Sequence, residues 1–358
     1  MPTLFDPVQA GELRLKNRIV MAALTRSRAG RTHVPNELLA EYYAQRASSG
    51  LMITEATMTA SDGCAFTGEA GLFDDACVEG WRRVTAGVHN RGGLILVQLW
   101  HPGRAAHSAL NAGVQPISST DRAIRNGTIR TPEGEQPYEI PRRLKRDEIP
   151  AVIEIFRSSA ARAAEAGFDG AQLHGAHGYL LDQFLRDSVN DRTDEYGGTI
   201  ENRARLLLEV VDATSAILGA GRVSVRISPL VPFNDIADSS PEELVDYVAT
   251  ELDRRGIGAL EMRHADHRAP AERTLARIAR KRFKGALLVN GGYDLDTARA
   301  AVESGQADAV VFGAKYVSNP DLVERWRQGA ELNALNAPTL YTPGPAGYVD
   351  YPALSAPD

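Results

Sequence analysis

Eight short apolar runs recur along the chain and restrict its fold more than any other feature. Each run starts with nearly continuous apolar residues and becomes polar at its end. Strands of parallel sheets, which are buried on both faces, have this pattern. The runs span residues 17–25, 51–59, 94–101, 170–177, 223–229, 259–265, 286–292 and 309–315.

Amphipathic helix patterns separate these runs. Apolar side chains follow helical spacing between residues 149 and 164. Ser240, Pro241 and Glu243 supply a helix N-cap, a proline for the first helical position and the acidic residue of a capping box. Glycines suited to a left-handed C-cap follow four of the helix patterns: Gly92, Gly167, Gly256 and Gly305.

This alternation, with no break in composition, predicts an α/β protein with a closed (β/α)₈ TIM barrel. A length of 358 residues suits one barrel with insertions, so we expect residues 1–358 to form a single domain. The alternative is an open doubly wound sheet. That fold usually carries a glycine-rich phosphate loop after its first strand, whereas residues 24–28 contain no glycine.

Three segments lie outside the barrel pattern. Residues 1–16 are expected to form an N-terminal hairpin that closes the barrel floor. Residues 102–147, after the third strand, form a long polar insertion rich in glycine and proline, as functional lids often are. Residues 331–358 are expected to form an extended C-terminal tail.

Composition narrows the classes of partner. The net charge of −6 gives no long-range attraction for nucleic acid or anionic lipid, and the basic residues at 280–282 are interpreted as a solvated helix face. No signal peptide or apolar span of about 20 residues is evident. Cys64 and Cys77 have no disulfide-framework or metal-ligand spacing. We therefore expect a cytoplasmic protein that acts on a small molecule and holds no metal.

Barrel active sites lie at the carboxyl ends of the strands. Glutamine, histidine and arginine within apolar strands are costly to bury unless they have a role. The runs end in such polar residues and in glycines, which we interpret as a functional ring: Thr25, Glu55 to Thr59, Gln98, Trp100, His101, His174, His177, Arg226, His264, Gly291, Gly292 and Gly313 to Lys315.

The glycines after the last two strands suit a phosphate site, where bare backbone N–H groups face an anion. Gly291, Gly292 and Gly313, with Lys315 beside them, favour this interpretation. The alternative is that these glycines serve only as turn residues.

His174 and His177 leave three interpretations open. In the first, the two histidines are metal ligands, although a carboxylate ligand and an early His-X-His sequence are missing. They donate hydrogen bonds to one substrate oxygen, or they are satisfied by backbone groups. Tyr179 lies two residues further on and either delivers a proton to a carbon or only packs.

Arg226 lies inside the run VSVRISP, where a buried guanidinium needs an anionic partner. One candidate partner is the N1–C2=O edge of a reduced isoalloxazine. The other is a core carboxylate, for instance Glu55 or Glu261. The residues alone favour neither.

These motifs resemble the old yellow enzyme family of FMN-dependent ene-reductases, and most of all the bacterial group that includes pentaerythritol tetranitrate reductase and N-ethylmaleimide reductase. The likeness runs nearly end to end. The most specific stretch is HGAHGYLLDQFL at 174–185 together with the EYGG and ENR sequences at 195–203. Further stretches are KNRIVMAALTR at 16–26, VQLWHPGR at 97–104, VRISP at 225–229, NPDL at 319–322 and GYVDYP at 347–352.

The resemblance implies a flavoenzyme that binds FMN and takes hydride from NADPH or NADH. It places Thr25 at flavin O4, Ala56 against the ring through its backbone, Gln98 at the pyrimidine edge and Arg226 at N1/O2. The phosphate positions it implies are Gly291, Gly292 and Gly313.

The resemblance also implies the substrate side of the site. His174 and His177 would grip the electron-withdrawing oxygen of the substrate, and Tyr179 would donate the proton. Trp100 would form an aromatic wall of the pocket. Tyr341 would overhang the substrate, and Phe66 stands where relatives often have tyrosine.

One departure concerns the FMN phosphate. The family usually has Phe-Gly-Arg after the eighth strand, whereas this chain has Ala314 followed by Lys315. A lysine supplies a point charge but not the two-pronged contact of a guanidinium, so we expect weaker FMN retention.

The expected reaction is reduction of activated C=C bonds in enones, nitroalkenes and maleimides, with nitrate esters as further acceptors, by a monomer or weak homo-oligomer. The alternatives are a flavin-barrel binding or sensor protein without turnover, and a barrel aldolase with Lys315 as Schiff base.

Overall fold

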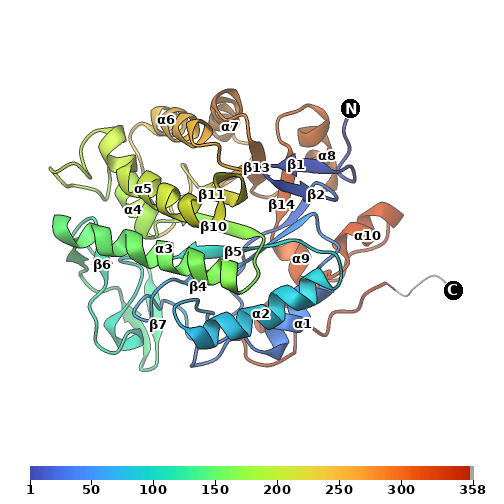
Figure 1. The fold of residues 1–358 in the computed structure, drawn as a ribbon, viewed down its shortest axis with the longest axis horizontal. Helices are drawn as coiled ribbons and strands as arrows, with labels where there is room; N and C mark the ends of the chain where they lie inside the picture. Colours follow the sequence, from blue (N-terminus) through green and yellow to red (C-terminus); the bar gives the residue numbers. More distant parts are fainter. Residues whose placement is uncertain (355–358) are drawn as a thin grey trace.

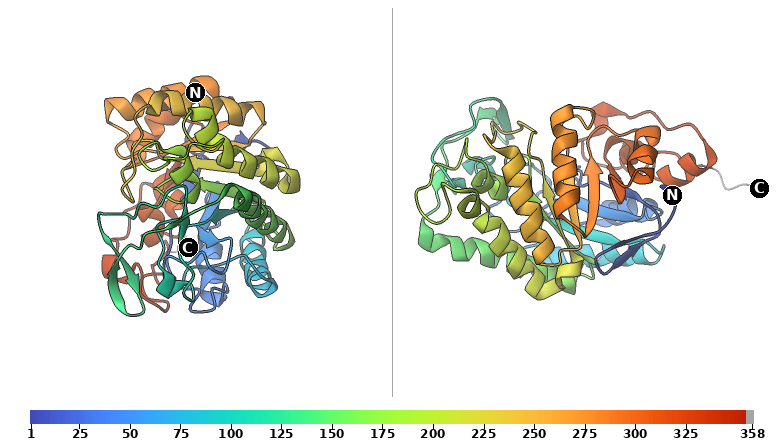
Figure 2. Two further views of the ribbon diagram at one scale, coloured as in Figure 1. Left: turned by 90° about the vertical axis from the view of Figure 1, so that its left-hand side faces the viewer. Right: turned by 90° about the horizontal axis from the view of Figure 1, so that it is seen from above.

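The computed structural model describes residues 1–354, and eight of its strands form a closed parallel barrel (Figures 1 and 2). Their order around the barrel is β10-β11-β12-β13-β14-β3-β4-β5. Each predicted run contains one strand, so the predicted barrel is confirmed. The strands are β3 (Ile19–Met21), β4 (Leu51–Met58), β5 (Ile95–Trp100), β10 (Gly170–Gly175), β11 (Val223–Ile227), β12 (Ala259–Arg263), β13 (Ala286–Asn290) and β14 (Ala309–Phe312).

Helices surround the barrel as an outer layer (Figure 1). They are α1 (Glu37–Gln45), α2 (Asp75–His89), α3 (Ile149–Glu165), α4 (Leu180–Leu185), α5 (Ile200–Leu218), α6 (Pro241–Arg254), α7 (Pro270–Arg282), α8 (Leu295–Glu303), α9 (Ala314–Ser318) and α10 (Leu322–Gln328). The four predicted capping glycines all have positive φ, between 66° and 82°, as a left-handed helix end requires.

The predicted capping box of α6 is wrong, although the helix does begin at Pro241. Ser240 is the N-cap residue, but its side chain makes no cap hydrogen bond. Its ψ of 58° departs from the extended backbone of an N-cap, and its N–H instead donates to Asp238 Oδ1.

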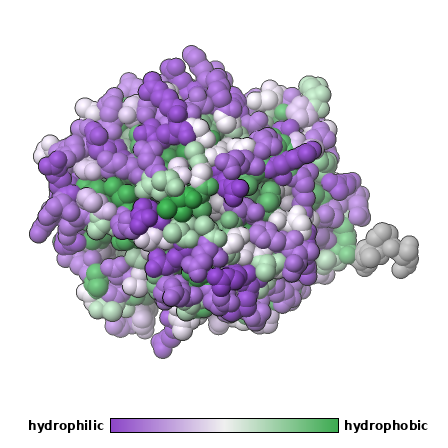
Figure 3. Space-filling model, in the orientation of Figure 1, coloured by the Kyte–Doolittle hydropathy of each residue, from purple (hydrophilic) through white to green (hydrophobic). Residues whose placement is uncertain are grey.

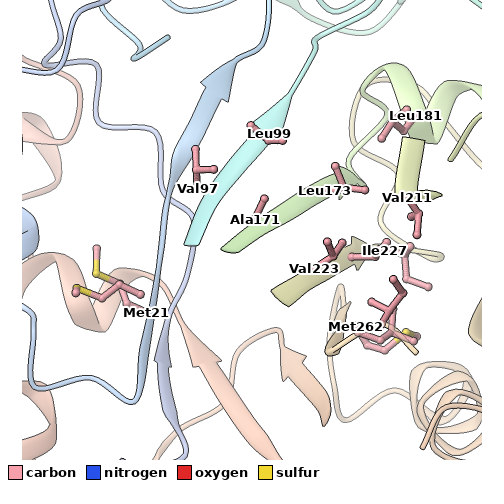
Figure 4. Packing of buried hydrophobic residues seen from close by; sticks show 14 of the residues in the cluster. Met21, Val97, Leu99, Ala171, Leu173, Leu181, Val211, Val223, Ile227 and Met262 are labelled. Atoms are coloured by element: carbon pink, nitrogen blue, oxygen red, sulfur yellow. The ribbon is translucent and has the colours of Figure 1, made fainter. Parts of the chain in front are cut away.

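Strand alternation decides which side chains face the mouth of the barrel. Val97 and Leu99 of β5 point outward and belong to the large core between the sheet and its helices, together with Leu173 of β10 and Leu181 of α4 (Figure 4). Because successive side chains point to opposite faces, Gln98 points inward. The inner face therefore carries the polar groups near the strand ends.

The predicted N-terminal hairpin is confirmed. It consists of β1 (Val8–Ala10) paired antiparallel with β2 (Leu13–Leu15). Ala10 and Leu15 pack in one cluster with Val20, Leu51 and Leu96, which lie early in barrel strands. The hairpin thus closes the floor, opposite the carboxyl ends of the strands.

The insertion at 102–147 has structure of its own. It contains a parallel pair, β6 (Ile117–Ser118) with β9 (Arg142–Arg143), and a hairpin of β7 (Thr128–Thr131) and β8 (Gly134–Pro137).

Up to residue 354 the tail contains no strand or α-helix after α10; it has a 3₁₀ turn at Ala337–Thr339 and further turns and bends between residues 340 and 351, and it packs on the barrel. Tyr348 is fully buried and stacks on Tyr42 at 4.0 Å. Arg26 and Arg28 donate hydrogen bonds to tail carbonyl groups. The predicted tail range extends to residue 358, and its last four residues lie outside the described part.

On the face shown in Figure 3, hydrophilic residues predominate, with smaller hydrophobic groups between them. Within residues 1–354, no helix combines the length and apolar character needed to cross a membrane.

Candidate active site at the mouth of the barrel

A buried chain of hydrogen bonds crosses the inside of the barrel near its mouth. Gln98 Nε2 donates to Gln172 Oε1 at 2.7 Å, and Gln172 Nε2 donates to Glu261 Oε2 at 2.9 Å. Asn290 Nδ2 donates to Glu261 Oε1 at 3.1 Å. All four side chains belong to buried residues on different strands, so the network fixes their orientations.

Arg226 is the charged member of this layer. Its Nε lies 3.1 Å from Glu261 Oε1, although it is not aligned to donate a hydrogen bond. The carboxylate interpretation is therefore confirmed with Glu261. It does not exclude the other interpretation, because the terminal guanidinium nitrogens make no hydrogen bond to any residue within 1–354 and stay available to an anion.

Thr25 and Ala56 lie on the adjoining strands β3 and β4. Thr25 follows the end of β3 and is half-buried. The register between β4 and β5 shifts between Ile53 and Ala56, and this shift sets Ala56 opposite Gln98. Both predicted flavin contacts therefore lie at the carboxyl edge of the barrel, in the same sector as Gln98.

The predicted phosphate glycines follow two neighbouring strands. Gly291 and Gly292 have φ of 133° and 82°. A Cβ added to Gly291 would lie 2.4 Å from the carbonyl oxygen of His264, so only glycine fits there. Gly313 precedes α9 and has φ of −95°, within the range open to any residue. Ala314 is exposed and Lys315 is half-buried.

A second guanidinium at the mouth was missed in the sequence. Arg263 ends β12, is the register partner of Asn290 and thus lies beside the Gly291 loop. Its Nη1 is buried and has no hydrogen-bond partner within residues 1–354. Burial and the nearby charge of Arg226 lower the pKa of Arg263. Arg263 could have been identified from the sequence, because it lies two residues after Glu261 and therefore on the same face of the strand.

The glycine loops, the free guanidinium ends and the buried amide layer together suit a flat anionic cofactor with a phosphate. The residues present therefore fit FMN. Two of its recognition groups, Gln98 and Arg226, are buried, whereas the predicted phosphate groups are backbone N–H groups and the half-buried Lys315.

His174 and His177 form a pair of neutral imidazoles. Their ring centroids are 5.5 Å apart. Burial and then the charge of Arg226 hold the pKa of both imidazoles well below the usual range. His174 Nδ1 accepts a hydrogen bond from the Ala176 N–H at 3.3 Å. The ring proton of His174 is therefore on Nε2, where it can be donated.

The backbone holds His177 in an uncommon conformation. Its φ is 57°, its N–H donates to Ser228 Oγ at 2.8 Å and its carbonyl accepts from Asn234 Nδ2 at 2.9 Å. A left-handed non-glycine residue costs roughly 1–2 kcal/mol, so these contacts keep the imidazole in position at a cost to stability. Among residues 1–354 no three His, Cys, Asp or Glu side chains gather as metal ligands do, so the pair has no third ligand.

Tyr179 connects the histidines to an aromatic wall. Its ring meets His174 and Trp100 edge-on, each at 5.0 Å, and Trp100 stacks near Phe66 at 6.1 Å. Burial raises the pKa of Tyr179, so the phenol keeps its proton. Tyr341, on the tail, is 67% exposed, and its predicted contact with the substrate stays a prediction.

Two further carboxyl groups are buried: Glu55, which the sequence analysis named only as a possible partner of Arg226, and Glu69, which it missed. Burial raises the pKa of Glu55 to about 7 and that of Glu69 to about 8. Glu69 accepts a hydrogen bond from the Ala65 N–H at 2.8 Å, and its charge adds to the raised pKa of Tyr179. His101, also named from the sequence, is buried, and burial lowers its pKa to about 4.

Comparison with known proteins agrees with this geometry. The family described as NADH:flavin oxidoreductase / NADH oxidase matches residues 3–333. A probable flavin mononucleotide-dependent alkene reductase of Leishmania infantum is 43% identical over 98% of this chain and 97% of its own length. Rice (Oryza sativa subsp. japonica) 12-oxophytodienoate reductase 7 is 43% identical over 99% of this chain and 95% of its own.

Comparison with solved structures agrees with these sequence comparisons. Morphinone reductase in complex with tetrahydroNAD superposes with a TM-score of 0.95 at 41% identity, covering 99% of this chain and 98% of the other. An old yellow enzyme homologue from Zymomonas mobilis has a TM-score of 0.95 at 44% identity, covering 99% and 100%.

Proposed function

The chain belongs to the NADH:flavin oxidoreductase / NADH oxidase family and is an FMN-dependent alkene reductase of the old yellow enzyme type; we propose that it reduces small electron-poor alkenes at the mouth of its barrel. The substrate classes are enones, nitroalkenes and maleimides. Nitrate esters are a further acceptor class, for which no carbon has to be protonated. The proposed hydride source is NADPH or NADH.

FMN, when bound, accepts hydride from the nicotinamide and passes it to the alkene. Four groups would hold its ring: Thr25, the backbone at Ala56, the Gln98 amide and the Arg226 guanidinium. Gly291, Gly292 and Gly313 would receive the phosphate through their N–H groups, with Lys315 as a nearby charge. Because Ala314 replaces the usual arginine, we expect weaker retention of FMN.

The two imidazoles would bind the carbonyl or nitro oxygen of the alkene. His174 would donate from Nε2, and the His177 ring lies beside it, with ring centroids 5.5 Å apart. As neutral donors they draw charge toward that oxygen without giving up a full proton, and this polarises the double bond. The low pKa of both groups, caused by burial and by Arg226, keeps them in this neutral form.

Tyr179 would protonate the α-carbon after hydride arrives at the β-carbon. The raised pKa of its phenol keeps the proton in place until the carbanion-like centre forms. Trp100 and Phe66 would wall the pocket against water, and Tyr341 would cover it from the tail.

The barrel with its insertions is proposed to be one FMN-binding domain, active in the cytoplasm as a monomer or weak homo-oligomer. Neither sequence-based alternative is favoured, because the relatives across the full length are flavin reductases. A binding protein without turnover would not need neutral imidazoles beside a protonated phenol. A barrel aldolase would need Lys315 as a Schiff base, and no observation favours that role.

The observation that carries the proposal is the His174–Tyr179 cluster, with two neutral imidazoles and one phenol at the mouth. The test separates the two half-reactions of the Tyr179→Phe variant by anaerobic stopped-flow. Flavin reduction by the nicotinamide should be unchanged, whereas reoxidation by 2-cyclohexenone should slow by about 10²–10⁴-fold. An unchanged reoxidation rate would remove Tyr179 from the mechanism.

A further inference from the structure

A cleft of about 820 Å³ lies on the outside of the barrel between α7 and α8, two helices of the outer layer (Figures 1 and 2). α7 forms one wall, and α8 forms the other. The loops after β12 and β13 supply its inner end, through His264, His267 and Tyr293. None of the residues proposed to hold FMN or the alkene lines this cleft.

The α7 wall carries a row of positive charges. Arg273, Arg277 and Lys281 are spaced four residues apart, so they share one face of the helix, and all three line the cleft. None of them forms an ion pair with a carboxylate within residues 1–354. Like charges at this spacing repel each other. An anion in the cleft would relieve that repulsion.

Neighbouring cations on the same helix differ in this respect. Arg280 also lines the cleft but pairs with Asp308, and Arg282, outside the cleft, pairs with Asp246 at 2.6 Å. The whole chain has a net charge of −6, so acidic partners are plentiful elsewhere. The unpaired row is therefore a local feature of the cleft and not a general surplus of positive charge.

The wall formed by α8 carries small side chains opposite the row of positive charges. It presents Ala300, Ala301 and Ser304 to the cleft, and Gly305 follows the helix. Arg273 and Lys281 are separated by about 12 Å along α7, at roughly 1.5 Å per residue. A cleft of this length and volume lies within the range of small-molecule sites.

Two buried imidazole nitrogens at the inner end have no partner within residues 1–354. They are Nε2 of His264 and Nε2 of His267, and His264 is only 1% exposed. His264 Nδ1 lies 2.8 Å from Glu272 Oε2, and His267 Nδ1 lies 2.8 Å from the Gly291 carbonyl. Both Nδ1 atoms face acceptors and therefore carry the proton. On each ring, Nε2 is therefore the atom left for a hydrogen bond with a ligand.

We propose that the cleft binds a phosphorylated polyol, with its phosphate on the Arg273–Lys281 row and a hydroxyl group hydrogen-bonded to the imidazole Nε2 atoms. Guanidinium groups and an ammonium group suit phosphate oxygens. The unpartnered Nε2 atoms suit hydroxyl groups, which can donate or accept a hydrogen bond and which inorganic phosphate dianion lacks. A ribose phosphate is the smallest common unit with both, and a nucleotide carries the same unit. This site does not depend on the reaction at the mouth.

The test is isothermal titration calorimetry on the FMN-loaded protein, with ribose 5-phosphate, AMP, adenosine and inorganic phosphate as probes. Ribose 5-phosphate and AMP should bind saturably with dissociation constants below about 1 mM. Phosphate alone and adenosine alone should each bind at least about tenfold more weakly. Tighter binding of AMP than of ribose 5-phosphate would identify a nucleotide as the occupant, and equal binding would identify a sugar phosphate.

Variants separate the two halves of the site. Arg273→Gln with Arg277→Gln should weaken ribose 5-phosphate, AMP and phosphate by about tenfold or more. Arg282→Gln, on the same helix but outside the cleft, is the control and should change none of them. His267→Asn keeps a donor for the Gly291 carbonyl and removes Nε2, so it should weaken only the hydroxyl-bearing probes.

The proposal fails if neither ribose 5-phosphate nor AMP binds saturably up to about 10 mM. It also fails if phosphate alone binds as tightly as ribose 5-phosphate, or if Arg282→Gln weakens binding as much as the double variant. Binding is measured without turnover, and the visible flavin absorbance reports the mouth separately. Failure of the reductase assignment therefore leaves this result unaffected.

Discussion

The two ends of the proposed cofactor cradle are built differently. At the ring end, Gln98 and Arg226 are buried and belong to a network that Gln172, Glu261 and Asn290 complete. At the phosphate end, the contacts are glycine backbone, the half-buried Lys315 and an alanine at position 314. At the ring end, hydrogen bonds among the side chains fix the groups that would contact the flavin. At the phosphate end, the conformation of the backbone positions the N–H groups.

The difference assigns separate tasks to the two ends. A ring held by fixed dipoles and a fixed charge has its electronic properties set by the protein, since buried groups need little reorganisation. A phosphate held by backbone N–H groups and the Lys315 ammonium group adds binding affinity without changing the electronic properties of the flavin ring. We therefore expect ring-end substitutions to affect FMN and riboflavin equally, and phosphate-end substitutions to affect FMN alone.

The largest effect is expected from Arg226→Met. Removing the guanidinium leaves Glu261 as an unpaired buried charge, which costs about 3–5 kcal/mol, and removes the partner of flavin N1/O2. Apoprotein should lose affinity for FMN and riboflavin alike, by roughly 10²–10³-fold in fluorescence titrations.

Arg226→Met combined with Glu261→Gln is the matched control, because it removes the unpaired carboxylate as well. It should recover most of the lost thermal stability but not the flavin affinity. If Arg226→Met weakens FMN binding but leaves riboflavin binding normal, the assignment of separate tasks to the two ends is wrong.

A smaller and opposite effect is expected from Ala314→Arg. A guanidinium at this position can contact the phosphate with two nitrogens, so FMN should bind about tenfold more tightly while riboflavin binding stays the same. Ala314→Gln has similar length without the charge and serves as the control. If the two flavins gain equally from arginine, the added group is not contacting the phosphate.

Arg263→Met should reduce FMN affinity by a few-fold and spare riboflavin. Its Nη1 is buried without a partner within residues 1–354 and its strand position borders the Gly291 loop, so its charge could replace that of the missing arginine. Lys315→Met should act in the same direction but less, because its ammonium group is only half-buried and partly screened by solvent. Lys284→Met, at an exposed position two residues after the end of α7, should not change FMN affinity, and an effect as large as that of Arg263→Met would indicate a bulk-charge effect.

The smallest expected effect is a pH dependence of stability caused by Glu69, near Tyr179. The pKa of Glu69 is raised from 4.5 to about 8 by burial, so the folded state binds its proton more tightly than the unfolded state does. This stabilisation is complete below pH 4.5 and is lost as pH rises through about 8. Glu69→Gln should therefore flatten the fall in unfolding free energy between about pH 5 and 8.5, measured in urea. Glu303→Gln, at an exposed position, should retain the wild-type slope.

Much of the fold could be predicted from sequence because its signals are local. Each apolar run became a barrel strand, and the four helix-ending glycines have the backbone they were chosen for. The Ser240 cap failed because its backbone turns toward Asp238, a detail of one loop.

The site was harder to predict, because register decides which groups meet. The link from Gln98 through Gln172 to Glu261 depends on pairing among neighbouring strands, which no single stretch reveals. Arg263 was overlooked for the same reason, since only its alignment with Asn290 sets it beside the phosphate loop. The positions proposed from family resemblance do gather at the mouth, while their roles await experiment.

The central claim is that FMN at this mouth carries hydride from a nicotinamide to an activated alkene, and sequential anaerobic mixing tests it most directly. FMN-loaded protein mixed with one equivalent of NADPH or NADH should lose its visible flavin absorbance, and 2-cyclohexenone added next should restore it and yield cyclohexanone. Protein that binds no FMN when it is supplied in excess, or bound flavin that is reduced but never reoxidised by any enone, nitroalkene or maleimide, would contradict the account.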